Sequence, residues 1–99
     1  MLPGKPRLSP TRPEGADDYK LAMQEMEYGA STEGMPSIEV LLGTDGEMII
    51  FNGVTRATRA YRYHPEAPVL VEVTDVLLHV NMSRYRTIGE VHDEKRSDE

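Results

Sequence analysis

The sequence predicts a single small α+β domain, in which a mixed β-sheet packs against two or three helices. Three observations support this fold class. Residues 17–28 repeat their apolar side chains with a helical period, residues 37–51 have the pattern of two strands joined by a tight turn, and residues 52–63 place an Asn-Gly pair before an arginine-rich segment. With 99 residues, the chain can bury one modest hydrophobic core.

Both ends of the chain differ in composition from its middle. Residues 1–15 hold four of the seven prolines, and proline lacks the amide donor that helices and inner strands require. We therefore predict an extended or disordered N-terminal arm over residues 1–15, in which Leu8 could open a short edge strand. The residues after 91 are mostly charged, which predicts a disordered acidic tail over residues 92–99. The folded domain is expected over residues 16–91.

The first helix is expected over residues 17–28. Its apolar stripe consists of Tyr19, Ala22, Met23 and Met26. These positions are spaced i, i+3, i+4 and i+7, which is the spacing of one face of an amphipathic helix. Asp17 suits the first turn, where a negative charge meets the positive end of the helix dipole.

Three strands are expected after this helix. Alternating apolar residues over 38–42, an Asp-Gly pair at positions 45–46 and an apolar return over 48–51 predict a β-hairpin. Residues 68–76 alternate valines with polar residues and predict a further strand. Residues 77–91 are ambiguous between a short helix and irregular chain.

The segment after Asn52-Gly53 has two interpretations. Asn-Gly is a strong hairpin signal, so residues 54–63 could form the second arm of a hairpin. In a strand, however, neither side of this segment would be cleanly apolar, whereas a helical period separates most of the apolar residues from the arginines. We favour a helix, which would end before Pro65 because proline disfavours helical geometry at the preceding residue.

If a helix begins there, the Asn52-Gly53 junction forms a small cradle for an anion. A strand that runs through a glycine turn into a helix leaves backbone N–H groups without partners at the helix N-terminus. Gly53 lets an anion approach the backbone, Thr55 adds a hydroxyl donor, and Arg56 can make a bidentate contact with a phosphate or carboxylate. The alternative, which the spacing alone also allows, is that the arginines of this helix form a solvated face.

The succession of these segments resembles the ParB/sulfiredoxin-like superfamily. Its members typically show a helix, a glycine, a proline-led strand, an Asp-Gly hairpin, a strand ending in a Gly-x-x-Arg turn, an alanine-rich helix and another strand. The corresponding segments of this chain are YKLAMQEMEYG, MPSIEVLL, TDGEMIIF, NGVTRATRA and APVLVEV. The resemblance covers residues 8–75 and implies a ParB/sulfiredoxin-like version of the α+β fold.

The resemblance also implies that Gly53, Thr55 and Arg56 face the phosphates of a nucleotide, with Asn52 at a position that is acidic or glycine in the family. The reactive residues of the family are missing from this chain. Val54 stands where sulfiredoxins carry their catalytic cysteine, and Thr55 stands where the serine kinases carry a histidine. The chain therefore looks like a binding member of the superfamily, or one whose chemistry is supplied elsewhere.

The expected function is binding of a phosphate-bearing small ligand, such as a nucleotide with Mg²⁺, at a strand-turn-helix anion site. The expected site residues are Asn52, Gly53, Thr55 and Arg56. Glu39 and Arg59 are auxiliary candidates, since a carboxylate on a strand can act as an acid, a base or a magnesium ligand beside a bound phosphate. No nucleophile or tuned acid–base pair accompanies this site, so the sequence leaves catalysis open.

The rival expectation is a non-catalytic protein-interaction module with a degenerate nucleotide site, which would use Arg59, Arg62 and Tyr63.

Seventeen acidic against eleven basic residues give a net charge of −6, which disfavours direct DNA binding. The three histidines lack ligand spacing, so no metal site made by them is expected. No apolar run reaches the roughly 18 residues of a membrane span, and a cytoplasmic location without cysteine-based sites is expected.

Overall fold

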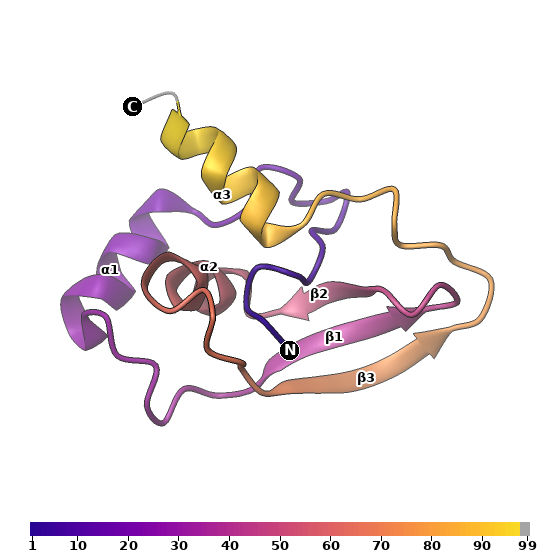
Figure 1. Ribbon diagram of the computed structural model, residues 1–99, viewed down its shortest axis with the longest axis horizontal. Helices are drawn as coiled ribbons and strands as arrows, with labels where there is room; N and C mark the ends of the chain where they lie inside the picture. The colour runs from indigo at the N-terminus through magenta and orange to yellow at the C-terminus, as the bar shows by residue number, and fades with distance from the viewer. Residues whose placement is uncertain (98–99) are drawn as a thin grey trace.

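The computed structural model describes residues 1–97, and within them three helices accompany a three-stranded sheet (Figure 1). This arrangement confirms the predicted α+β class and the order helix, hairpin, helix, strand. The elements are α1 (Asp18–Tyr28), β1 (Ile38–Gly43), β2 (Met48–Asn52), α2 (Val54–Tyr63), β3 (Val71–Leu77) and α3 (Ile88–Ser97). The ambiguous region after β3 is therefore irregular at first and helical from Ile88 onwards.

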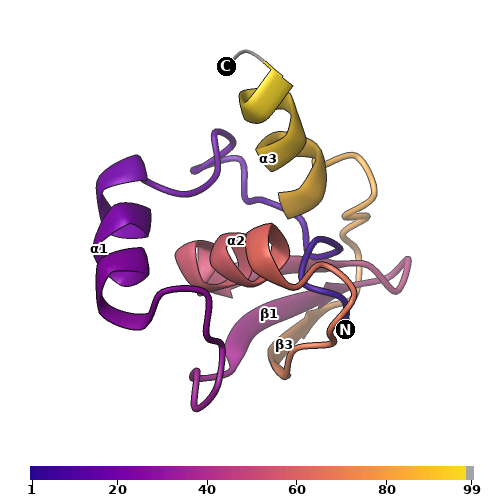
Figure 2. The same cartoon turned by 60° about the vertical axis from the view of Figure 1, so that its left-hand side comes forward.

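The sheet is mixed, with the strand order β2-β1-β3. The hairpin strands β1 and β2 pair antiparallel across a turn in which Gly46 has a φ of 79°, as the Asp-Gly signal predicts. Strand β3 pairs parallel with β1, which requires a long crossover connection, and this connection includes α2. Helix α2 packs against β1, and α1 and α3 pack against α2 (Figure 2).

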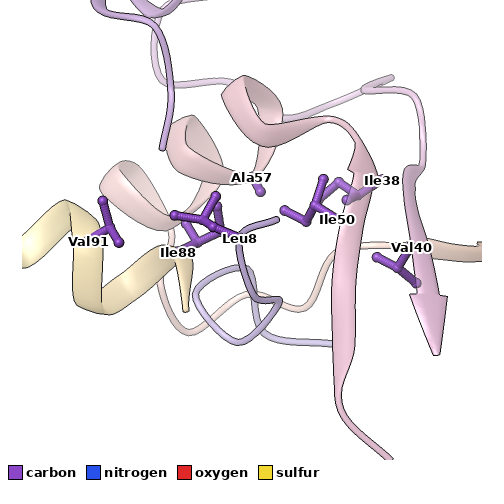
Figure 3. Packing of buried hydrophobic residues seen from close by; sticks show 7 residues of the cluster. All are labelled: Leu8, Ile38, Val40, Ile50, Ala57, Ile88 and Val91. Atoms are coloured by element: carbon purple, nitrogen blue, oxygen red, sulfur yellow. The ribbon is translucent and has the colours of Figure 1, made fainter. Parts of the chain in front are cut away.

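The N-terminal arm belongs to the core. Pro3 and Pro6 are almost fully buried, and Leu8 lies in the main apolar cluster (Figure 3). The backbone of Arg7 pairs with the outer edge of β2, where its N–H donates to Met48 O at 2.8 Å. The disordered alternative for residues 1–15 is therefore wrong, because burial of the arm and its backbone hydrogen bonds offset the entropy cost of ordering it. The main cluster comprises Leu8, Ile38, Val40, Ile50, Ala57, Ile88 and Val91.

Helix α1 begins with the expected acidic residue, because Asp17 Oδ1 accepts hydrogen bonds from the backbone N–H groups of Tyr19 and Lys20. Its apolar stripe, however, faces away from the core. Tyr19, Met23 and Met26 are 73%, 50% and 83% exposed. The opposite side of α1, which carries Leu21, packs towards α2.

The C-terminal region is helical, so the predicted disordered tail is wrong for residues 92–97, and residues 98–99 lie outside the described residues. A capping box starts α3. Glu90 N–H donates to Thr87 Oγ1 at 3.1 Å, and Thr87 N–H donates to Glu90 Oε1 at 3.2 Å. The hydrogen bonds from Thr87 hold the pKa of Glu90 below its usual value, so their stabilising effect is present at neutral pH and is lost as the pH falls through that lowered pKa. Val91 and Ile88 then anchor the helix in the core.

Candidate anion-binding site

The junction between β2 and α2 has the geometry that an exposed helix N-terminus requires. Gly53 is the N-cap residue of α2, with a φ of 117° and a ψ of 22°, and no side chain of the described residues caps the helix. The helical ladder starts when Ala57 N–H donates to Gly53 O at 2.9 Å. The hairpin interpretation of Asn52-Gly53 is therefore wrong. The first turn of α2 offers backbone N–H groups, and with them the positive end of the helix dipole, to a ligand.

The guanidinium of Arg56 folds back over this N-terminus. A Cβ atom at Gly53 would lie 3.0 Å from Nη2 of Arg56 and 3.3 Å from its Nε. Only a glycine therefore combines the left-handed φ with space for the guanidinium. Within residues 1–97, the side chain of Arg56 makes no ion pair, so its donors remain available beside the helix N-terminus.

Arg59 lies one turn further along the helix and is 3% exposed. Its Nη1 donates to Ser31 O at 3.0 Å, and its guanidinium carbon lies 5.0 Å from the centre of the Tyr28 ring. Its Nε is buried and has no hydrogen-bond partner among the described residues. No carboxylate of residues 1–97 forms an ion pair with it. Arg59 is thus a buried cation without an anion.

The third arginine of the helix has a different environment. Arg62 Nη1 lies 2.5 Å from Glu25 Oε1, and Arg62 Nε donates to His92 Nε2 at 3.3 Å. These contacts connect α2 with α1 and α3. The prediction of a solvated arginine face is therefore wrong, because α1 covers Arg59 and neutralises Arg62. Of the predicted partner surface of Arg59, Arg62 and Tyr63, the structure buries Arg59, pairs the half-buried Arg62 with Glu25 and leaves Tyr63 38% exposed. The protein-interaction alternative stays a prediction.

A groove of about 880 Å³ opens around the N-terminus of α2. It brings together five of the six residues that the sequence singled out, namely Asn52, Gly53, Thr55, Arg56 and Arg59. The remaining walls come from the N-terminal arm, from α1, from the loop that follows α1, from β1 and β2, and from residues 77–85. Gln24 of α1 also lines the groove, and its Oε1 is buried without a hydrogen-bond partner among residues 1–97.

The sixth residue, Glu39, does not line the groove but contacts a residue that does. Its Oε2 accepts a hydrogen bond from Asn52 Nδ2 at 2.8 Å, so the Asn52 amide is held by the neighbouring strand. Within the described chain, no three histidine, aspartate or glutamate side chains come together to hold a metal ion. Since Mg²⁺ in phosphate sites needs only one or two carboxylates besides the phosphate oxygens, the residues present fit a magnesium ion only if the ligand brings it.

Comparison with known protein families, with curated proteins and with solved structures finds no match to this chain. Over residues 1–97, no helix combines the length and the apolar character that crossing a membrane requires.

Proposed function

We propose that this chain binds a small phosphate-bearing anion at the N-terminus of α2. Backbone N–H groups of the first turn, the Thr55 hydroxyl and the Arg56 guanidinium would surround one phosphate, and Arg59 would neutralise it from beneath. The observation that supports this proposal most strongly is the burial of Arg59 without a carboxylate partner.

Burying the Arg59 guanidinium has an energetic cost. Removing a charged side chain from water costs several kcal/mol unless a counter-charge compensates. A buried N–H without an acceptor costs about 1–3 kcal/mol more. A bound anion would supply both the counter-charge and the acceptor, and it would thereby offset the free-energy cost of burying Arg59.

The size of the groove supports a ligand larger than a single ion. Pockets for small molecules and cofactors occupy about 300–1,000 Å³, and this groove has about 880 Å³. We therefore include a nucleotide with Mg²⁺ among the proposed ligands.

We also propose the ParB/sulfiredoxin-like subclass of the α+β fold, because its order of elements agrees with the order α1, β1, β2, α2 and β3 of this chain. We propose a cytoplasmic location as well. We propose no reaction, because nothing among the described residues assigns a base to activate the hydroxyl groups that line the groove.

The test is thermal unfolding in the presence of a panel of nucleotides and magnesium. A ligand at about ten times its Kd should raise the free energy of unfolding by about 1.4 kcal/mol, which corresponds to roughly 5–10 °C for a domain of this size. We expect this shift in Tm for the wild type and its loss in Arg56→Ala. The control is Arg96→Ala, which removes the same charge from an exposed position on α3 and should keep the shift. A shift that survives in Arg56→Ala, or no shift with any nucleotide, would contradict the proposal.

A further inference from the structure

The groove around the α2 N-terminus concentrates positive charge in an acidic protein. The chain has a net charge of −6, yet the groove residues include four cations and a single carboxylate, Glu33. The cations are Arg12, Lys20, Arg56 and Arg59. This local positive field, opposite in sign to the net charge, attracts a small anion to the groove. Most of the acidic residues lie outside the groove and take no part in recognising the anion.

These cations come from three separate parts of the chain. Arg56 and Arg59 belong to α2, Lys20 belongs to α1, and Arg12 belongs to the N-terminal arm. Within residues 1–97 none of the four forms an ion pair. Outside the groove, three arginines, at positions 7, 62 and 86, pair with glutamates, whereas Lys5, Arg84, Lys95 and Arg96 form no ion pair with residues 1–97. What distinguishes the groove is therefore the grouping of four unpaired cations around one space.

A single phosphate does not account for all four cations. The helix N-terminus with Arg56 and Arg59 already provides the charge and the donors that one phosphate needs. A phosphate ion has the size of a few water molecules, at about 30 Å³ each, whereas the groove has about 880 Å³. Arg12 and Lys20 are therefore additional charges, placed on the walls that the arm and α1 contribute.

We propose that the groove takes a chain of linked phosphates, with one phosphate at the α2 N-terminus and the following ones held by Arg12 and Lys20. This inference rests on the proposed anion site and adds the class of ligand to it. Linked phosphates could come from a nucleoside triphosphate or from inorganic polyphosphate. Both present the same chemistry, several negative charges along a short flexible chain, to the same four cations.

The experiment compares the affinities of inorganic phosphate, tripolyphosphate and ATP at constant ionic strength, by calorimetric titration. For the wild type we expect tripolyphosphate to bind at least tenfold more tightly than inorganic phosphate. The double variant Arg12→Ala/Lys20→Ala should lose about tenfold in affinity for tripolyphosphate and less than twofold for inorganic phosphate, because two surface charge contacts together contribute about one factor of ten. Both residues are exposed, so the variant is expected to fold.

The matched control is Lys5→Ala/Arg96→Ala, which removes two exposed cations that do not line the groove. Equal losses in the two double variants would overturn the inference, since the net charge alone would then explain binding. Equal affinities for phosphate and tripolyphosphate in the wild type would also overturn it, and would leave the anion site at α2 standing. Absence of binding by all three ligands would overturn both proposals. Tighter binding of ATP than of tripolyphosphate would identify a nucleotide as the source, and equal binding would identify the phosphate chain itself.

Discussion

Replacing Arg59 with methionine should abolish the response of the protein to phosphate without lowering the stability of the ligand-free form. Methionine occupies a similar volume and removes a buried charge that has no counter-ion among residues 1–97. The substitution also removes the hydrogen bond to Ser31 O and the contact with the Tyr28 ring, which contribute about 1 kcal/mol each. We therefore expect the free energy of unfolding in urea to stay equal or to rise by about 1 kcal/mol.

The chain offers a matched control one turn along the same helix. Arg62→Met removes a partner of Glu25 and should lower the free energy of unfolding by about 1–3 kcal/mol, because a half-buried carboxylate is left unpaired. Phosphate binding should remain unchanged in this variant, since Arg62 does not line the groove. If Arg59→Met is destabilised as strongly as Arg62→Met, Arg59 has a structural role and the buried charge is no signature of a ligand.

The second large effect is expected in the N-terminal arm. Leu8→Ala should lower the free energy of unfolding by about 2–5 kcal/mol, because Leu8 is 2% exposed and its loss leaves a cavity in the main apolar cluster. Urea unfolding followed by far-ultraviolet circular dichroism measures this change. The same substitution at Leu70, which is 78% exposed, should change stability by less than about 0.5 kcal/mol. Equal results for Leu8 and Leu70 would show that the arm is not docked in solution.

Local signals along the chain were sufficient for the strand-to-helix junction. The Asp-Gly turn, the alternation in β1 and the helical period after Gly53 each depend on a few neighbouring residues, and the structure contains the elements that they predict. The grouping of Asn52, Gly53, Thr55 and Arg56 in one groove follows from the same local pattern.

The environment of the arginines could not be predicted, because it depends on how α1 is rotated. The apolar stripe with Tyr19 and Met26 suggested which face of α1 would be buried, yet the structure turns Leu21 and Glu25 towards α2 instead. This rotation pairs Glu25 with Arg62 and covers Arg59. Periodicity shows which face of a helix is apolar, but tertiary contacts between segments that are distant in sequence determine which face packs against the rest of the protein.

The docking of the arm and the extent of α3 were not predicted, for different reasons. Residues 1–15 are rich in proline and lack a periodic pattern, so nothing local indicates that Leu8 reaches the core. For α3 a local signal was present. Thr87 and Glu90 have the spacing of a capping box and precede an apolar residue, Val91, which together mark the start of a helix.

Anion binding at the N-terminus of α2 is tested most directly by a nuclear magnetic resonance titration of the ¹⁵N-labelled protein with inorganic phosphate, at constant ionic strength. We expect the largest shifts in the backbone N–H groups of residues 54–56 and in the Nε–H of Arg59, because these donors would contact the anion. Shifts confined to other regions, with these four N–H groups unmoved at saturation, would contradict this expectation.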